Sequence, residues 1–139
     1  MDAQPKRARS TRRLLVVACA SSAGLHGALV PTHASEGQAI GGLFALSALL
    51  LIAVALVIEN SADLRAVATA AVLLAALLAI YGASRAVAVW PLEHAEPIDA
   101  IGAVTKLFEA AGLLLALGLL QIQRTAAKEL PASTEGVDS

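Results

Sequence analysis

Four long runs of apolar residues alternate with short polar segments along the chain. They cover residues 14–30, 39–58, 66–90 and 101–121, and the 139-residue sequence is 58% hydrophobic with 15% charged residues. A helix needs about 20 apolar residues to cross the roughly 30 Å hydrocarbon core of a bilayer. Each run therefore predicts a transmembrane helix. The predicted fold class is an all-α, polytopic membrane protein with four transmembrane helices in an antiparallel bundle.

The segments outside these runs are predicted to be tails and short loops around one domain, residues 14–122. Residues 1–13 form a basic tail, and residues 123–139 form a polar tail that is expected to be disordered. Pro31 is expected to end the first helix, because proline lacks the backbone N–H of a helical residue. Gly37 and Gly41 form a pair of small residues that favours close approach of two helices.

Lys and Arg are distributed unequally between the predicted loops, which indicates an orientation. The first and third loops, residues 31–38 and 91–100, contain neither residue type. Basic residues flank the other side of the predicted bundle: Lys6, Arg7, Arg9, Arg12, Arg13, Arg65, Arg124 and Lys128. Short cytoplasmic loops retain Lys and Arg. Both termini are therefore predicted to be cytoplasmic, in a multi-pass protein of the cytoplasmic (inner) membrane. The net charge of −1 gives no support for nucleic-acid binding.

Several ionisable residues fall inside the predicted spans: His26, Tyr81, Arg85, Lys106 and Glu109. At ~1.5 Å per residue, His26 lies about 6 Å, Arg85 about 8 Å and Glu109 about 12 Å from the predicted outer helix ends. A charge near the bilayer centre costs about 2.5–3.5 kcal/mol, so these groups are expected to pair. One interpretation is an Arg85–Glu109 clamp with Lys106 reaching outward. The other is a polar pocket, open to the outside, that binds an anion, a proton or a small polar ligand.

Helical spacing predicts which sides of the first and fourth helices face inward. Cys19, Ser22 and His26 form one stripe on the first helix. On the fourth helix the corresponding stripe contains Gly102, Thr105, Glu109, Gly112 and Ala116. Polar and small residues face other helices rather than lipid, so both stripes are expected to point into the bundle.

All three histidines fall on the predicted outer side, among four carboxylates. The set is His26, His33, Glu36, Glu93, His94, Glu96 and Asp99. Imidazole and carboxylate together suit a divalent transition metal ion such as Zn²⁺. Imidazole also changes its charge between about pH 5 and 8, which suits a proton-responsive site. A solvated acidic loop is the third interpretation, and the sequence alone leaves all three open.

The order of these motifs resembles a group of small four-span membrane proteins of high-GC actinobacteria that have no assigned activity. The resemblance covers roughly residues 20–112. It rests on His26, His33 with Glu36, Gly41 to Phe44, Tyr81 with Ser84 and Arg85, Glu96-Pro97, and Glu109. The third loop here, VAVWPLEHAEPID, departs from the Gly-rich loop of that group. The resemblance implies a topology and candidate residues, and no chemistry.

The sequence favours a membrane protein that is not an enzyme, because it contains no Gly-rich phosphate loop, nucleophile elbow or HExxH motif. The leading hypothesis is a small integral membrane protein with a polar, metal-binding or proton-responsive site on its extracytoplasmic half. The alternative is an accessory or structural subunit of a larger membrane complex. The expected partners are the lipid bilayer and a second membrane protein or further copies of the chain.

Overall fold

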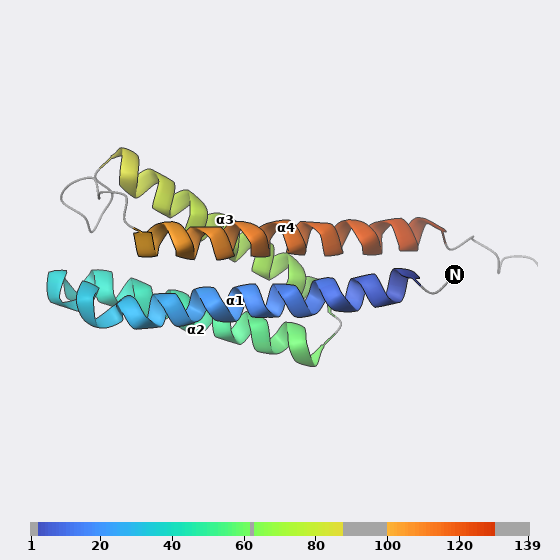
Figure 1. Cartoon of the computed structure of the whole chain (residues 1–139), viewed down its shortest axis with the longest axis horizontal. Coiled ribbons are helices and arrows are strands. Elements are labelled where there is room, and N and C mark those ends of the chain that lie inside the picture. Colours follow the sequence, from blue (N-terminus) through green and yellow to red (C-terminus); the bar gives the residue numbers. More distant parts are fainter. Residues whose placement is uncertain (1–2, 62, 88–99, 130–139) are drawn as a thin grey trace, which may run out of the picture.

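Four helices account for most of the residues that the computed structural model describes, which are residues 3–61, 63–87 and 100–129. Their bounds are Ala3–Glu36 for α1, Gln38–Asn60 for α2, Leu64–Ala86 for α3 and Ala100–Glu129 for α4. Successive helices run in opposite directions (Figure 1). All four are long and apolar enough to cross a membrane. Within these described residues, the all-helical prediction is confirmed, and so is the number of apolar helices.

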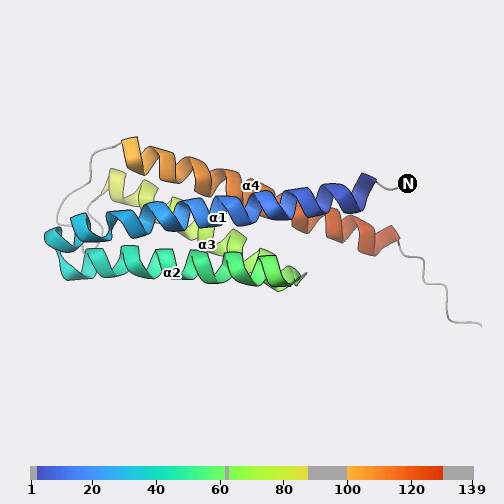
Figure 2. The same ribbon diagram turned by 60° about the horizontal axis from the view of Figure 1, so that its bottom comes forward.

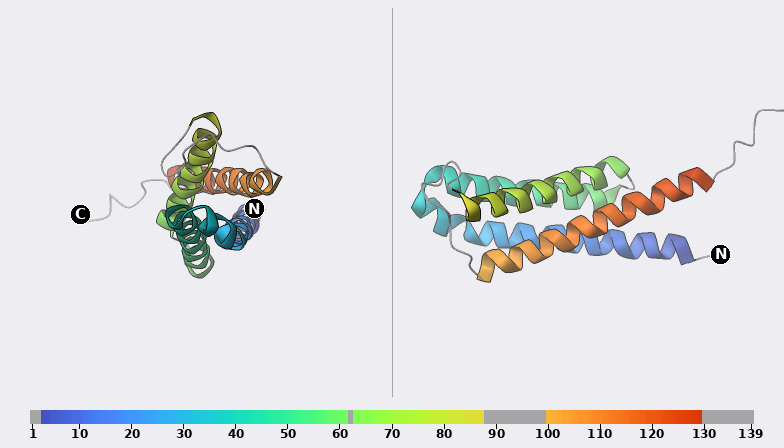
Figure 3. Two further views of the ribbon diagram at one scale, coloured as in Figure 1. Left: turned by 90° about the vertical axis from the view of Figure 1, so that its left-hand side faces the viewer. Right: turned by 90° about the horizontal axis from the view of Figure 1, so that it is seen from above.

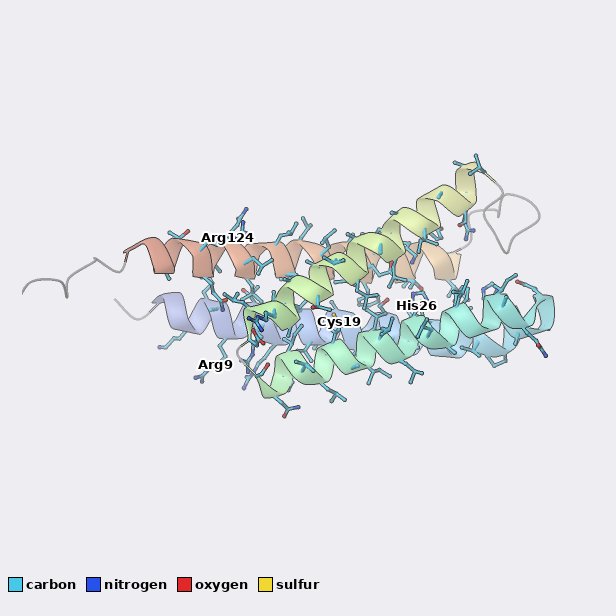
Figure 4. All side chains as sticks on the ribbon, turned by 180° about the vertical axis from the view of Figure 1, so that it is seen from behind. Arg9, Cys19, His26 and Arg124 are labelled. Atoms are coloured by element: carbon cyan, nitrogen blue, oxygen red, sulfur yellow. The ribbon has the colours of Figure 1, made fainter. Side chains whose placement is uncertain are left out.

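The bundle has two distinct ends. At the hairpin end, α1 turns into α2 at Gly37, α3 ends and α4 begins. The basic end holds the start of α1, the α2–α3 connection around Ser61 and Asp63, and the end of α4 (Figure 2). Arg9 and Arg124 lie near the basic end, whereas His26 lies further toward the hairpin end (Figure 4).

Helices α1 and α4 form the middle of the arrangement. Helix α1 packs most extensively on α2 and next on α4, and α3 packs mainly on α4. Helices α2 and α3 are joined at the basic end but pack on each other less than either packs on its main partner, and they diverge toward the hairpin end (Figures 1 and 3). Helix α4 therefore contacts both α1 and α3.

The core consists of small and aliphatic side chains in the half of the bundle nearer the basic end. Its fully buried members include Leu15 and Cys19 of α1, Leu51 of α2, Leu74 of α3 and Ala116 of α4. Leu and Ile side chains on the outward faces are exposed, as expected of helices that meet lipid. At the basic end, the Asp63 side chain accepts a hydrogen bond of 2.8 Å from the Arg65 N–H and caps α3.

The predicted end of the first helix at Pro31 is wrong. Helix α1 continues through Pro31 to Glu36, and only Gly37 separates it from α2. Proline removes its own N–H but can itself adopt helical angles, and the residues after it can still donate to earlier carbonyls. The final turn of α1 is also held by tertiary packing, because a Cβ added at Gly41 would lie 2.7 Å from the Ala34 Cα. The predicted loop of residues 31–38 is thus largely helical.

The other predicted boundaries shift as well. Helices α1 and α4 extend into the segments predicted to be tails, so residues 3–13 and 123–129 are helical. At ~1.5 Å per residue, α1 is about 51 Å long and α4 about 45 Å, both longer than a hydrocarbon core. The third predicted helix ends at Ala86 instead of residue 90. The disorder predicted for residues 130–139 lies outside the described residues.

Candidate functional site

Glu109 of α4 is completely buried and stands at the centre of a polar cluster. Its Oε2 atom accepts a hydrogen bond of 2.6 Å from the Lys106 Nζ, one turn away on the same helix. Its Oε1 atom accepts a 3.2 Å hydrogen bond from the Ser22 hydroxyl and lies 2.9 Å from the His26 Nε2. Both carboxylate oxygens are therefore occupied by groups from α1 and α4.

The inward-facing stripes explain why these residues meet. Ser22, His26, Thr105 and Glu109 are all buried, which confirms that both predicted stripes face the interior. His26 lies ten residues before the end of α1 and Glu109 nine residues after the start of α4. At ~1.5 Å per residue both lie about 14–15 Å from those helix ends. The sequence predicted unequal depths for His26 and Glu109 because the first helix was expected to end at Pro31, too early in the chain.

The His26 ring has one occupied and one unoccupied nitrogen. With Nε2–H donating to the Glu109 carboxylate, Nδ1 is the bare nitrogen of the neutral ring. Nδ1 is buried and has no hydrogen-bond partner among the described residues. The site thus holds a buried ring nitrogen without a described partner, beside a buried carboxylate.

Helix α3 contributes an aromatic ring, Tyr81, that lies close to two cations. The Arg85 Cζ lies 4.3 Å from the centroid of the Tyr81 ring, and the Lys106 Nζ lies 5.2 Å from it. Cations within about 6 Å of an aromatic face are attracted to it. Tyr81 therefore links the positive groups of α3 and α4, although its own hydroxyl is buried without a described partner.

The predicted Arg85–Glu109 clamp is not the observed pairing. Glu109 pairs with Lys106, which points inward with 15% of its side chain exposed instead of reaching outward. The Arg85 Nη1 donates a 3.4 Å hydrogen bond to the Ser84 hydroxyl. Lys106 pairs with Glu109 in place of Arg85 because it lies three residues earlier on the same helix. This spacing brings the two side chains together without help from tertiary packing.

A second, more exposed pair lies at the hairpin end of α1. The His33 Nδ1 is 2.7 Å from the Glu36 Oε2, so the extra turn of helix beyond Pro31 brings this His-x-x-Glu pair together. The Phe44 ring of α2 stacks on His33 at 4.1 Å between centroids and packs obliquely against His26 at 5.3 Å. One aromatic ring thus lies between the exposed and the buried histidine.

Ser22 and Phe44 complete the cluster but were not predicted as site residues. The stripe with Cys19 and His26 placed Ser22 on the correct side of its helix. No local pattern assigns Phe44 to the site, because its contacts with His26 and His33 depend on how α2 packs against α1.

The predicted metal-ligand set does not come together in the part of the chain that the structure describes. Residues 3–61, 63–87 and 100–129 contain no group of three or more His, Cys, Asp or Glu side chains that could hold a metal ion. His26 and Glu109 form one pair, and His33 and Glu36 form another. The remaining predicted ligands, Glu93, His94, Glu96 and Asp99, lie outside the described residues.

These observations define a class: an all-helical protein with four helices able to cross a membrane and a buried ionisable cluster shared by α1, α3 and α4. Comparison with known protein families, curated proteins and solved structures found no match for this chain. The resemblance to small actinobacterial four-span proteins therefore stays a prediction.

Proposed function

We propose that this chain is a multi-pass protein of the cytoplasmic membrane, with both termini inside, whose outer half contains a proton-responsive site. The observation that carries the proposal is Glu109, a fully buried carboxylate in contact with both an imidazole and an ammonium group. Ionisable side chains within membrane spans are rare and generally serve function, because an unpaired charge there is costly. The distribution of Lys and Arg supports the orientation.

The occupancy of the carboxylate favours proton binding over metal binding. A metal at Glu109 would have to displace the 2.6 Å Lys106 bond or the His26 and Ser22 contacts. A structural metal site usually has four protein ligands and a catalytic one three, which the described residues do not bring together at any point. A metal role consequently depends on Glu93, His94, Glu96 and Asp99.

The surroundings of His26 make its charge consequential. Glu109 and Lys106 neutralise each other, so a neutral His26 leaves this trio uncharged and a protonated His26 makes it positive. Arg85 and Tyr81 face the trio from α3, and His33 and Glu36 lie beyond the Phe44 ring. Helix α2 contributes that uncharged ring. Proton uptake would therefore alter attraction and repulsion between α1, α3 and α4.

The test is to follow both groups spectroscopically in protein reconstituted into lipid bilayers. Nitrogen-15 NMR of labelled histidine, recorded as the pH is changed, should show a change in the protonation pattern of the His26 ring. Infrared difference spectra over the same pH change should contain a Glu109 band that is absent from Glu109→Gln. His33→Ala serves as the control, because it removes the exposed pair and leaves the buried one intact.

Two outcomes separate this proposal from a purely structural cluster. A change at His26 or Glu109 that persists in His33→Ala supports a proton-responsive site. If the signals of His26 and Glu109 do not change with pH while that of His33 does, the buried trio is a purely structural contact between α1 and α4, and the proposal is wrong.

The divergence of α2 and α3 favours one alternative, an accessory subunit of a larger membrane complex. These helices pack on each other less than on their main partners, α1 and α4, and they separate toward the hairpin end. Exposed apolar side chains there, Leu43 and Leu46 on α2 and Ile80 on α3, would suit a partner helix as well as lipid. Stoichiometric co-purification of a partner that is lost on Leu46→Ser and Ile80→Ser, but not on Glu109→Gln, would support this alternative.

A further inference from the structure

The first turns of α1 carry a group of exposed cations at the basic end. Lys6, Arg9 and Arg13 are exposed and spaced so that they fall on one face of the helix. Ala8, Leu15 and Cys19 lie on the side that packs against the core. The three cations therefore point away from the bundle, which we call the outer basic face.

Arg12 differs from these residues because it is used internally. Its guanidinium donates hydrogen bonds of 3.4 Å to the Ser61 carbonyl and 3.2 Å to the Glu59 carbonyl. These contacts hold the start of α1 against the α2–α3 connection. The outer basic face is thus presented by a helix whose start is held in place.

An exposed apolar residue continues this face along the same helix. Val17 lies one turn beyond Arg13 on the same side and is 57% exposed. A cationic turn followed by an apolar turn matches the order of phosphate and acyl chain in a phospholipid. Residues 3–13 extend α1 by about 16 Å beyond Leu14, which is enough to span a headgroup layer.

We propose that the outer basic face, formed by Lys6, Arg9 and Arg13, binds the phosphate groups of anionic phospholipids in the cytoplasmic leaflet. Clusters of Lys and Arg immediately inside a membrane span are attracted to anionic lipid. This surface favours a lipid over an acidic protein, because Val17 continues the cationic face with apolar surface. The inference rests on the membrane-spanning part of the proposed function, but not on proton binding.

The test uses the full chain in nanodiscs and compares spin-labelled phosphatidylglycerol with spin-labelled phosphatidylcholine. The fraction of each labelled lipid that is immobilised by the protein gives their relative association. We expect wild type to prefer phosphatidylglycerol. In K6Q/R9Q/R13Q this preference should fall by about fivefold or more, since one cation near an anionic surface contributes about that factor. Raising the salt concentration should weaken the preference.

The matched control is R7Q/R65Q/R124Q, which removes the same number of exposed cations at the basic end but none from the outer basic face. It should retain most of the preference. Equal losses in the two variants would attribute the preference to net charge and overturn the proposal. Equal association of the two lipids with wild type would also overturn it, and binding of polyglutamate to such discs would then indicate an acidic protein partner.

The same preparation separates this proposal from the proposed function. Failure of wild type to insert into either lipid would contradict the membrane-spanning part, and the lipid proposal with it. Insertion without lipid preference would overturn the lipid proposal alone. The spectroscopic changes at His26 and Glu109 test proton binding independently, because neither residue belongs to the outer basic face.

Discussion

The His26 Nε2 lies 2.9 Å from the Glu109 Oε1 and joins α1 to α4 across 83 residues of sequence. Both side chains are buried, and Lys106 binds the other carboxylate oxygen. Neither the imidazole nor the ammonium can exchange this partner for water without exposing the interior. The contact therefore ties the stability of the bundle to the chemistry of the site.

Glu109→Ala is expected to destabilise the protein strongly. Removing one member of a buried ion pair costs about 3–5 kcal/mol, because the other charge is left without a partner. Glu109→Gln should cost less, since the amide keeps the shape of the side chain and one hydrogen-bond acceptor. Unfolding in detergent, followed by circular dichroism, measures both variants.

The control for this prediction is Glu36→Gln, which alters a carboxylate that also contacts a histidine but is 48% exposed. Its effect should stay within about 0.5 kcal/mol, as for most surface substitutions. Equal losses at Glu36 and Glu109 would contradict the assignment of Glu109 to the buried centre of the cluster.

The two histidine–carboxylate pairs should differ in how strongly their members are coupled. A double-mutant cycle of His26→Ala and Glu109→Gln should give a coupling energy of about 1 kcal/mol or more, because residues in direct contact are not additive. The cycle of His33→Ala and Glu36→Gln should give less than about 0.5 kcal/mol, since the pair is partly solvated. A larger value for the exposed pair would mean that burial does not strengthen the contact.

The features that could be predicted from the sequence are those set by local pattern. Runs of apolar residues predicted four helices, and the spacing of Ser22 and His26 predicted their inward direction. The Lys106–Glu109 contact also follows from spacing on one helix. The Arg85–Glu109 prediction went wrong because it assigned partners by charge alone, although the chain places a cation three residues from Glu109.

The features that sequence could not predict depend on packing between helices. The final turn of α1 persists past Pro31 where Ala34 packs on Gly41. That turn also brings His33 onto Phe44. Because the first helix was expected to end at Pro31, these contacts could not be predicted.

Gly41→Ala should weaken the α1–α2 hairpin. A Cβ at this position would lie 2.7 Å from the Ala34 Cα and 2.8 Å from its Cβ, so the two helices would have to separate. Overpacking of this kind typically costs about 1–3 kcal/mol. Gly42→Ala is a matched control, because a Cβ there meets nothing within 4 Å. It should be neutral or stabilising by up to about 1 kcal/mol, the usual gain of Ala over Gly in a helix.

Melting temperatures of the two glycine variants, with proteolysis near the α1–α2 junction, measure this difference. The close approach of α1 and α2 would be contradicted if Gly41→Ala and Gly42→Ala behaved alike.

Single cysteines should report the proposed orientation. The native Cys19 is buried, so Cys19→Ala provides a background without reactive thiols. In intact cells a membrane-impermeant maleimide should label Glu36→Cys at the hairpin end, and should label Arg65→Cys at the basic end only after permeabilisation. Both positions are exposed in the bundle, so a difference in labelling reflects the side of the membrane. The reverse pattern would place the termini outside.

Phe44→Leu should increase solvent access to His26 without abolishing the fold. The Phe44 ring lies between His33, at 4.1 Å, and His26, at 5.3 Å, and a smaller aliphatic side chain cannot maintain both contacts. We expect faster exchange of the His26 ring protons with water, at a cost in stability of about 1.5 kcal/mol or less. NMR of labelled histidine measures the exchange. Phe108→Leu is the control, because it changes the other half-buried phenylalanine of the chain. Equal acceleration in both variants would mean that exchange follows general loosening of the bundle, and that the Phe44 ring does not shield His26.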